Sequence, residues 1–459
     1  MGGYISGIKK MKNLKLILVF SSIIGLLSLI YTIYQTDEPF LFILSILYIM
    51  GGLWLYKSNE ERFFYFFSLN VALFFLPILT HSYLQQTGSP FIPGGDAQTY
   101  YEKVMEMLRG DFSRFYGRYK LYLYVGWKFY EIINIFTTTT SYIYFVFLNI
   151  FIGANISPLL YKVGKRISKN ETLIYACLMT SLFPLIIQVT DGTWREGFIY
   201  APFLYSIYLA INLKNTKYLL FFFITFLFII NIRMEVGIAS LIFFILYNYV
   251  FLDKYGKTNK PYINKSISIG ALIIGIMFCL YIGLFEYLNY STSASLEYQI
   301  EAYNEASNEM SEGNSIANTL RNMGFLGKLL LFFYSLFSPI PPPAFTVPIP
   351  YFHYYFISLG SIIWYFVFPV SIFGLIKELK NKELLSFVKS LLITLVFGIG
   401  IISITTVGTA RHKLYLYPLL FLFYFHTISN LSPKEIFKLY SKIIVVYLGG
   451  FLLYLYIKY

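Results

Sequence analysis

The sequence contains few charged residues and almost no cysteine. Only 13% of its 459 residues are charged, whereas about a quarter of an ordinary soluble domain is charged. This scarcity excludes an ordinary soluble domain. The two cysteines, Cys177 and Cys279, lie inside apolar runs without metal-ligand spacing, so we interpret them as buried packing residues.

Apolar and aromatic residues take the place of the missing charge. Hydrophobic residues make up 57% of the chain and aromatic residues 21%. Apolar runs of about 20 residues recur from end to end, and each is long enough to cross roughly 30 Å of hydrocarbon as a helix. Because backbone groups inside a bilayer have no partner outside a helix or a closed barrel, we predict an all-α, polytopic membrane protein.

The net charge of +13 does not require a nucleic-acid partner. Membrane proteins collect Lys and Arg in their cytoplasmic loops for topological reasons. We therefore expect membrane lipids, and no nucleic acid, as partners. The high content of Lys, Ile, Tyr and Asn suggests a bacterial source with an AT-rich genome, and hence a multi-pass protein of the plasma membrane.

The distribution of lysines predicts one membrane-embedded domain, residues 1–459, with a cytoplasmic N-terminus and about 13 spans. Two long loops, 84–140 and 291–352, are expected outside. The segment 121–136 is short, aromatic and charged near its middle, so we predict an interfacial helix there. The predicted spans are 14–34, 39–56, 62–83, 141–161, 171–189, 196–213, 217–232, 236–252, 266–290, 355–375, 384–405, 413–430 and 440–457.

Charged residues that were not used to set this topology fall on the same predicted outer face. One such surface, with carboxylates, arginines and a histidine, suits a phosphorylated lipid, because arginine binds phosphate oxygens bidentately and keeps its charge. The candidates are Asp96 as a catalytic residue, Arg411, His412 and Arg195 as phosphate-binding residues, and Asp191, Glu196, Arg233, Glu235 and Tyr100 as supporting residues.

Ordinary structural roles are open for the same residues. Gly-Gly-Asp before a helical stretch is a good helix start, so Asp96 could simply begin a helix. Arg195 and Glu196 could form an anchor at the membrane interface. Arg411 and His412 could be snorkelling side chains at the end of a span.

Three motifs carry a family resemblance, and one of them is the stretch 191–196, DGTWRE, at the outer end of a predicted span. The stretch 95–110, GDAQTYYEKVMEMLRG, is followed by an aromatic segment and a span that ends in a basic turn, and the stretch 411–418 reads RHKLYLYP. Together they resemble GT-C-type glycosyltransferases, the polyprenyl-phosphate-dependent membrane enzymes that include protein O-mannosyltransferases and the aminoarabinose transferases of lipid A. Ala97 stands where many of those relatives have a second acidic residue.

The resemblance implies an inverting glycosyltransferase of the cell envelope, acting in polysaccharide biosynthesis or a related transfer. The donor would be a polyprenyl-phosphate sugar and the acceptor a saccharide, lipid or protein, with Asp96 as general base at the extracytoplasmic face. A divalent cation near Asp96 stays open, but no ligand cluster has recognisable spacing, so no metal is predicted. The alternatives are a lipid-linked oligosaccharide polymerase or ligase, and a transporter or flippase of polysaccharide precursors.

Overall fold

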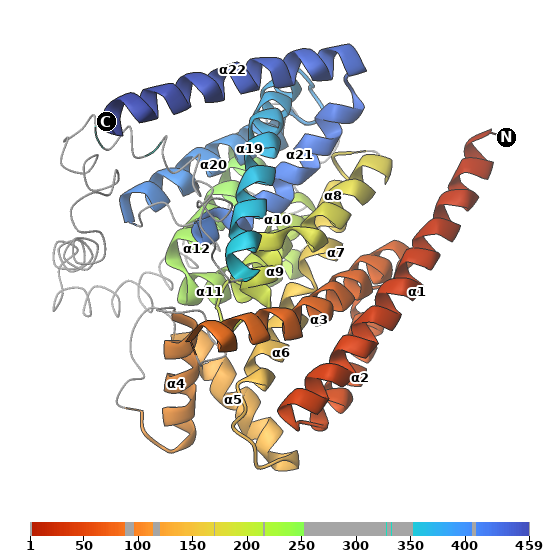
Figure 1. Cartoon of the computed structure of the whole chain (residues 1–459). Helices are drawn as coiled ribbons and strands as arrows, with labels where there is room; N and C mark the ends of the chain where they lie inside the picture. The colour runs from red at the N-terminus through yellow and green to blue at the C-terminus, as the bar shows by residue number, and fades with distance from the viewer. Residues whose placement is uncertain are drawn as a thin grey trace.

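A computed structural model describes residues 2–87, 96–112, 120–168, 170–213, 216–251, 352–405 and 410–458, with the isolated positions 327 and 332. Every regular element in this part of the chain is a helix (Figure 1). The elements are α1 (Gly2–Thr36), α2 (Phe40–Leu55), α3 (Asn59–Thr87), α4 (Asp96–Leu108), α5 (Lys120–Phe136), α6 (Ile143–Gly153), α7 (Ile156–Gly164), α8 (Asn170–Leu182), α9 (Pro184–Thr190), α10 (Gly197–Ile211), α11 (Thr216–Ile232), α12 (Met234–Ile245), the π-helix η1 (Leu246–Phe251), α19 (Phe352–Glu378), α20 (Leu385–Thr405), the 3₁₀-helix η3 (Ala410–Leu416), α21 (Tyr417–Ser429) and α22 (Pro433–Lys458).

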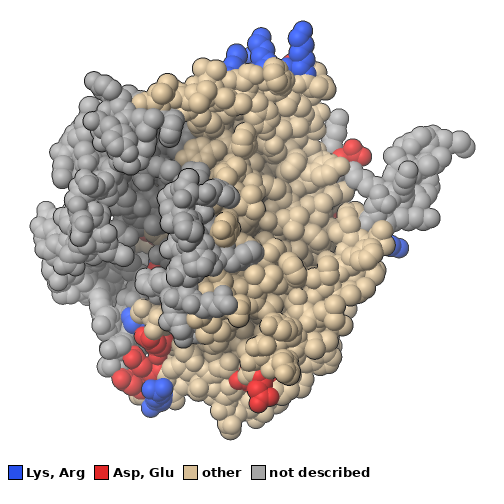
Figure 2. Space-filling view, in the orientation of Figure 1, with Lys and Arg blue, Asp and Glu red and all other residues tan. Residues whose placement is uncertain are grey.

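Several of the described helices are long and apolar enough to cross a membrane. Five pass by length and composition, and a sixth is added if the bent pair α8 and α9 is one span. Figure 2 shows basic side chains along the top edge, where α22 runs, and a broad surface below with almost no charge. The five segments are Leu14–Thr36, Asn59–Leu84, Ile143–Gly164, Met234–Phe251 and Tyr355–Glu378. The all-α prediction is therefore confirmed for the described residues, and these helices are consistent with a membrane location.

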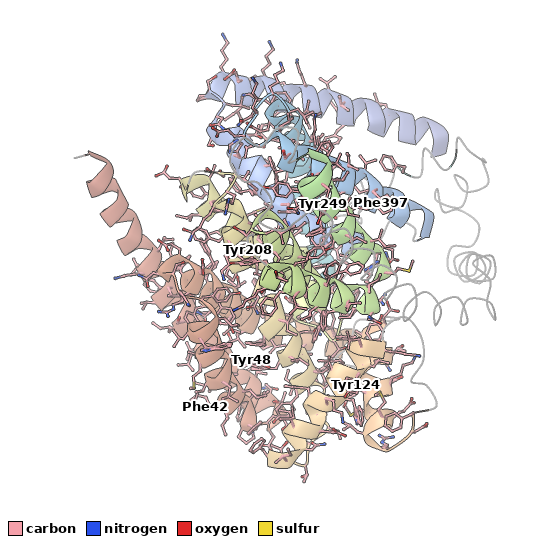
Figure 3. All side chains as sticks on the ribbon, turned by 180° about the vertical axis from the view of Figure 1, so that it is seen from behind. Phe42, Tyr48, Tyr124, Tyr208, Tyr249 and Phe397 are labelled. Carbon is pink, nitrogen blue, oxygen red and sulfur yellow. The ribbon has the colours of Figure 1, made fainter. Side chains whose placement is uncertain are left out.

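Helix α2 has one apolar face that packs against other helices and one apolar face that is exposed. Phe42 is 47% exposed, whereas Tyr48 is 6% exposed and stacks on Phe151 of α6 with ring centroids 4.3 Å apart; Figure 3 labels Phe42 and Tyr48 on the same helix. In water such an exposed apolar face would be unfavourable, because each buried Phe or Leu side chain gains about 1.5–3 kcal/mol over an exposed one. The exposed face of α2 fits contact with lipid.

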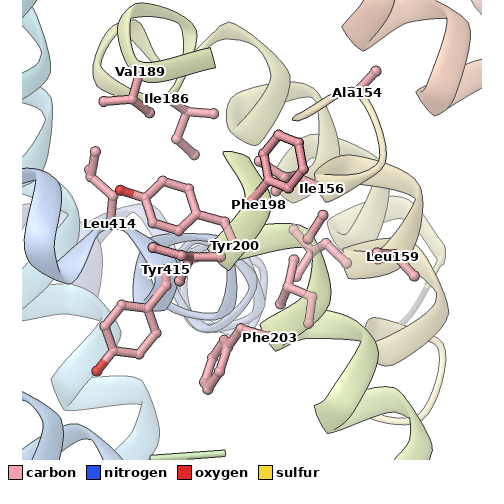
Figure 4. Packing of buried hydrophobic residues seen from close by; sticks show 14 of the residues in the cluster. Ala154, Ile156, Leu159, Ile186, Val189, Phe198, Tyr200, Phe203, Leu414 and Tyr415 are labelled. Carbon is pink, nitrogen blue, oxygen red and sulfur yellow. The ribbon is translucent and has the colours of Figure 1, made fainter. Parts of the chain in front are cut away.

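Helix α10 lies near the centre of the core. Its residues Tyr200 and Phe203 are fully buried, and the Phe203 ring meets Tyr415 of η3 edge to face at 4.8 Å. Figure 4 shows α9, α10 and η3 contributing side chains to this one cluster. The late segment η3 therefore packs against α10, which belongs to the first half of the chain.

Two predicted spans have different boundaries in the structure. The span 171–189 is interrupted, because Pro184 has no N–H and holds Phe183 in an extended conformation (φ −71°, ψ 118°); α8 and α9 meet there at 52°. The span 413–430 begins later, at Tyr417, because η3 occupies residues 410–416 and Pro418 lies in the first turn of α21.

Other predictions fall outside the described residues. They are the span 266–290, almost all of the second outer loop 291–352, and the parts 88–95 and 113–119 of the first outer loop. Helix α5 matches the predicted interfacial segment 121–136 and is not among the helices that pass as membrane spans.

Candidate functional site

Three segments that are distant in sequence meet at one place, which we call the junction. They are the first turn of α4, the loop after α9 and the turn between α11 and α12. The loop after α9 contacts the first turn of α4, where the Thr193 hydroxyl donates to the carbonyl of Ala97 at 2.6 Å. The same loop contacts the turn between α11 and α12, where Arg195 Nη1 donates to the carbonyl of Ile232 at 3.1 Å. The structure thereby brings the Asp96, Arg195 and Arg233 segments together.

Two buried polar side chains, Asn149 and Tyr122, form hydrogen bonds to the backbone of the loop after α9. Asn149 of α6 donates through Nδ2 to the carbonyl of Gly192 at 2.6 Å and to the Tyr122 hydroxyl at 3.1 Å. The Tyr122 hydroxyl in turn donates to the carbonyl of Thr193 at 2.8 Å. Both side chains are fully buried. Sequence reasoning missed them, and the one available signal was an asparagine inside an apolar run, which is costly in a membrane unless it has partners.

Arg195 and Asp96 lie in one electrostatic environment. Asp96 is half-buried and is the first residue of α4, so it begins a helix, which is the structural role that the sequence left open for it. The Arg195 guanidinium lies 5.9 Å from the centroid of the Tyr100 ring. Burial lowers the pKa of Arg195, but Tyr100, two glutamates and Asp96 outweigh burial, and the net effect raises that pKa. Arg195 therefore keeps its positive charge, within electrostatic reach of the Asp96 carboxyl group.

A buried ion-pair cluster lies next to Arg195. Arg233 is 4% exposed and Glu196 is 2% exposed. Arg233 Nη1 is 3.6 Å from Glu196 Oε1, and its Nε is 3.8 Å from Glu235 Oε2. Charges removed from water to this extent need partners. The cluster explains why the two short turns contain charged residues instead of the Gly, Asn and Ser that are sufficient for a turn.

Helix η3 contains the late candidates. His412 is buried, and so is Lys413, which the prediction passed over. Lys413 Nζ lies 5.4 Å from the centroid of the Trp364 ring. The side chain of Arg411 lies outside the described part of the chain. Tyr415, on the same short helix, lies within electrostatic reach of Arg233 and Glu235, so η3 borders the ion-pair cluster.

Asp191 is a buried carboxyl group at the end of α9. It follows the last residue of α9 and is 3% exposed, and its supporting role on the outer face stays a prediction. Thr190 Oγ1 lies 3.4 Å from Asp191 Oδ1. Burial raises the pKa of Asp191 well above its ordinary value, and the Thr190 hydrogen bond opposes this only in part. A carboxyl group in this position tends to hold its proton.

Within the residues that the structure describes, no three His, Cys, Asp or Glu side chains gather as a metal site would require. Comparison of the sequence with models of known protein families and with curated proteins found no match. The functional conclusion therefore rests on the geometry of this junction and on the motifs in the sequence.

Proposed function

We propose that the chain is a GT-C-type membrane glycosyltransferase with about 13 spans, which moves a sugar from a polyprenyl-phosphate donor to an acceptor at the extracytoplasmic face of the plasma membrane. The observation that supports this most is the junction itself. It combines the Asp96 carboxyl group with a permanently charged Arg195 that is held between α4, α10 and α11. Such a transfer needs a base and an anion-binding group within reach of one substrate.

In the proposed reaction, Asp96 takes the proton from an acceptor hydroxyl as its oxygen attacks the anomeric carbon. The bond from that carbon to the phosphate oxygen breaks, and the electron pair leaves with the lipid phosphate. A single displacement inverts the anomeric centre. Arg195, with Arg411 and His412, stabilises the negative charge that develops on the phosphate. Arg233 and Glu196 position Arg195.

The test is an in vitro transfer assay with polyprenyl-phosphate sugars and the Asp96→Asn variant. Loss of a general base lowers rates by about 10²–10⁴-fold, and we expect a loss in that range with unchanged expression. Asp111→Asn is the matched control, because it removes the same charge after the other end of α4. Transfer by Asp96→Asn at the wild-type rate would remove Asp96 from the mechanism.

One observation favours a second candidate, a transporter. The span 171–189 is broken into α8 and α9, and a buried aspartate, Asp191, follows the last residue of α9. Broken helices and buried acidic residues are frequent at the substrate and ion sites of transporters. Proteoliposomes loaded with a lipid-linked sugar distinguish the two functions, since a flippase moves the intact molecule between leaflets and a transferase cleaves it.

A further inference from the structure

The break between α8 and α9 borders a small internal cavity. The centre of a water molecule can occupy about 20 Å³ of this cavity. A single water needs about 10–15 Å³ measured in the same way. The space therefore suits one water-sized occupant. Besides apolar groups, five hydroxyl-bearing side chains from α3, α7, α8 and α9 line it, namely Ser68, Ser157, Thr180, Ser181 and Thr190.

The protons of these hydroxyl groups are already in use. Thr180 donates to the carbonyl of Ala176 at 2.8 Å, and Thr190 donates to the carbonyl of Ile186 at 3.0 Å. Ser157 and Ser181 both donate to the carbonyl of Cys177, at 2.7 and 3.1 Å, which leaves Ser68 to donate to Ser181 at 2.7 Å. A hydroxyl has one proton and two lone pairs. The cavity wall therefore offers lone pairs and no spare protons.

The helix break lies next to the same wall. Pro184 has no N–H, so the carbonyl of Thr180, four residues earlier, lacks its usual intrahelical donor. The last carbonyls of α8 also carry the partial negative charge of a helix C-terminus. Thr180 and Ser181, both in this last turn, line the cavity.

We propose that this cavity binds one monovalent cation, sodium or potassium. A water molecule has two protons and can satisfy only two of the acceptors, whereas a cation can be coordinated by all the oxygens around it. The polar side chains that line the cavity are neutral hydroxyls without a carboxylate, so a divalent ion, which takes carboxylates, fits less well. Unwound carbonyls and the C-terminal ends of broken helices coordinate such ions in other membrane proteins.

The bound ion would fix the angle between α8 and α9. Thr190 is the last residue of α9, and the loop that contacts α4 begins two residues later, at Gly192. Occupancy therefore stabilises the position of Thr193 and Arg195. This role is independent of the proposed transfer reaction, because it concerns only the packing of α8 and α9.

The experiment uses the purified full-length chain in detergent, with thermal unfolding followed in sodium chloride, potassium chloride and choline chloride at equal ionic strength. A ligand that binds only the folded state raises the melting temperature in a saturable way. We expect sodium or potassium to raise Tm by several degrees over choline, and binding of radiolabelled sodium or rubidium to reach one ion per chain. The ion that gives the larger shift identifies the occupant.

Variants locate the effect. Thr180→Val and Ser157→Ala each remove one oxygen from the cavity, and we expect both to lose most of the cation response. Thr394→Val is the matched control, since Thr394 is also a buried threonine that donates to the carbonyl four residues earlier, at 2.7 Å, but it lies outside the cavity. Equal Tm in all three salts, without ion binding, would mean that the cavity holds only a water and would overturn the proposal. An equal loss of response in Thr394→Val would overturn the location.

Discussion

The buried pair of Arg233 and Glu196 allows the sharpest prediction about stability. Replacing Arg233 by methionine leaves the Glu196 carboxylate buried without its main counter-charge. Replacing Glu196 by glutamine leaves Arg233 with Glu235, which lies 3.8 Å away and is 21% exposed. The two single variants should therefore be unequal, and the arginine variant should be the less stable.

The magnitude follows from the burial of the pair. Breaking a buried ion pair from one side costs about 3–5 kcal/mol, because the remaining charge stays desolvated. Arg195 also interacts with Glu196, so we expect the lower end, about 3 kcal/mol, for Arg233→Met. In a chain of this size each kcal/mol shifts Tm by about 2 °C, which gives a drop of about 6 °C. Glu196→Gln should lose about half as much.

The double variant tests the cause. With both charges removed no carboxylate is left unpaired, so the double variant should lose less than the sum of the singles by about 1 kcal/mol or more. The assay is thermal unfolding in detergent. Lys128→Met is the control, because Lys128 and Glu131 are 2.7 Å apart but over 40% exposed, and an exposed pair contributes only about 0–1 kcal/mol. Additive losses within about 0.5 kcal/mol, or an equal loss in the control, would refute the reasoning.

Three further predictions address the junction and the membrane topology. Asp191 has a folded pKa raised above its unfolded value near 3.8, so wild-type stability should fall as pH rises above that value, by up to about 1.4 kcal/mol per pH unit; the Tm advantage of Asp191→Asn should therefore grow between pH 5 and pH 8, and a constant difference would contradict this. Thr193→Val removes the hydrogen bond to Ala97 and should lower kcat about tenfold, the equivalent of about 1.4 kcal/mol, while Tm changes by less than it does in Arg233→Met. In a cysteine-free background, a cysteine at the exposed position Gln98 should react with an impermeant thiol reagent from outside intact cells, and one at exposed Asn381 only after permeabilisation; the reverse pattern would invert the predicted topology.

The sequence was sufficient for the class of fold. Low charge and repeated apolar runs can be satisfied in a bilayer only by helices or a closed barrel, and the helical character of the described residues confirms this. Most predicted span boundaries in the described part lie within a few residues of the observed helices. Two of the exceptions have local causes, since Pro184 interrupts one helix and η3 precedes another; in addition, α22 begins at Pro433 instead of residue 440.

The candidate site was predictable only in part. Asp96, Arg195 and Arg233 could be selected because charge at a short turn between apolar runs is unusual, and a topology counted from lysines assigned them to one face. The sequence does not contain the distances among them. Asn149 and Tyr122 were missed, because a polar atom in an apolar run reveals its partner only when the helices are packed.

The sequence by itself therefore determined the helical architecture and the selection of charged turns, because hydrophobicity and helix periodicity are local properties of the chain. Only the tertiary structure decided that Thr193 contacts α4, that Glu196 and Arg233 are buried together, and that Asp191 is enclosed. The acceptor-lined cavity at the break between α8 and α9 likewise exists only once four helices are packed. Burial and pairing are relations between distant segments, and they arise when the helices close around them.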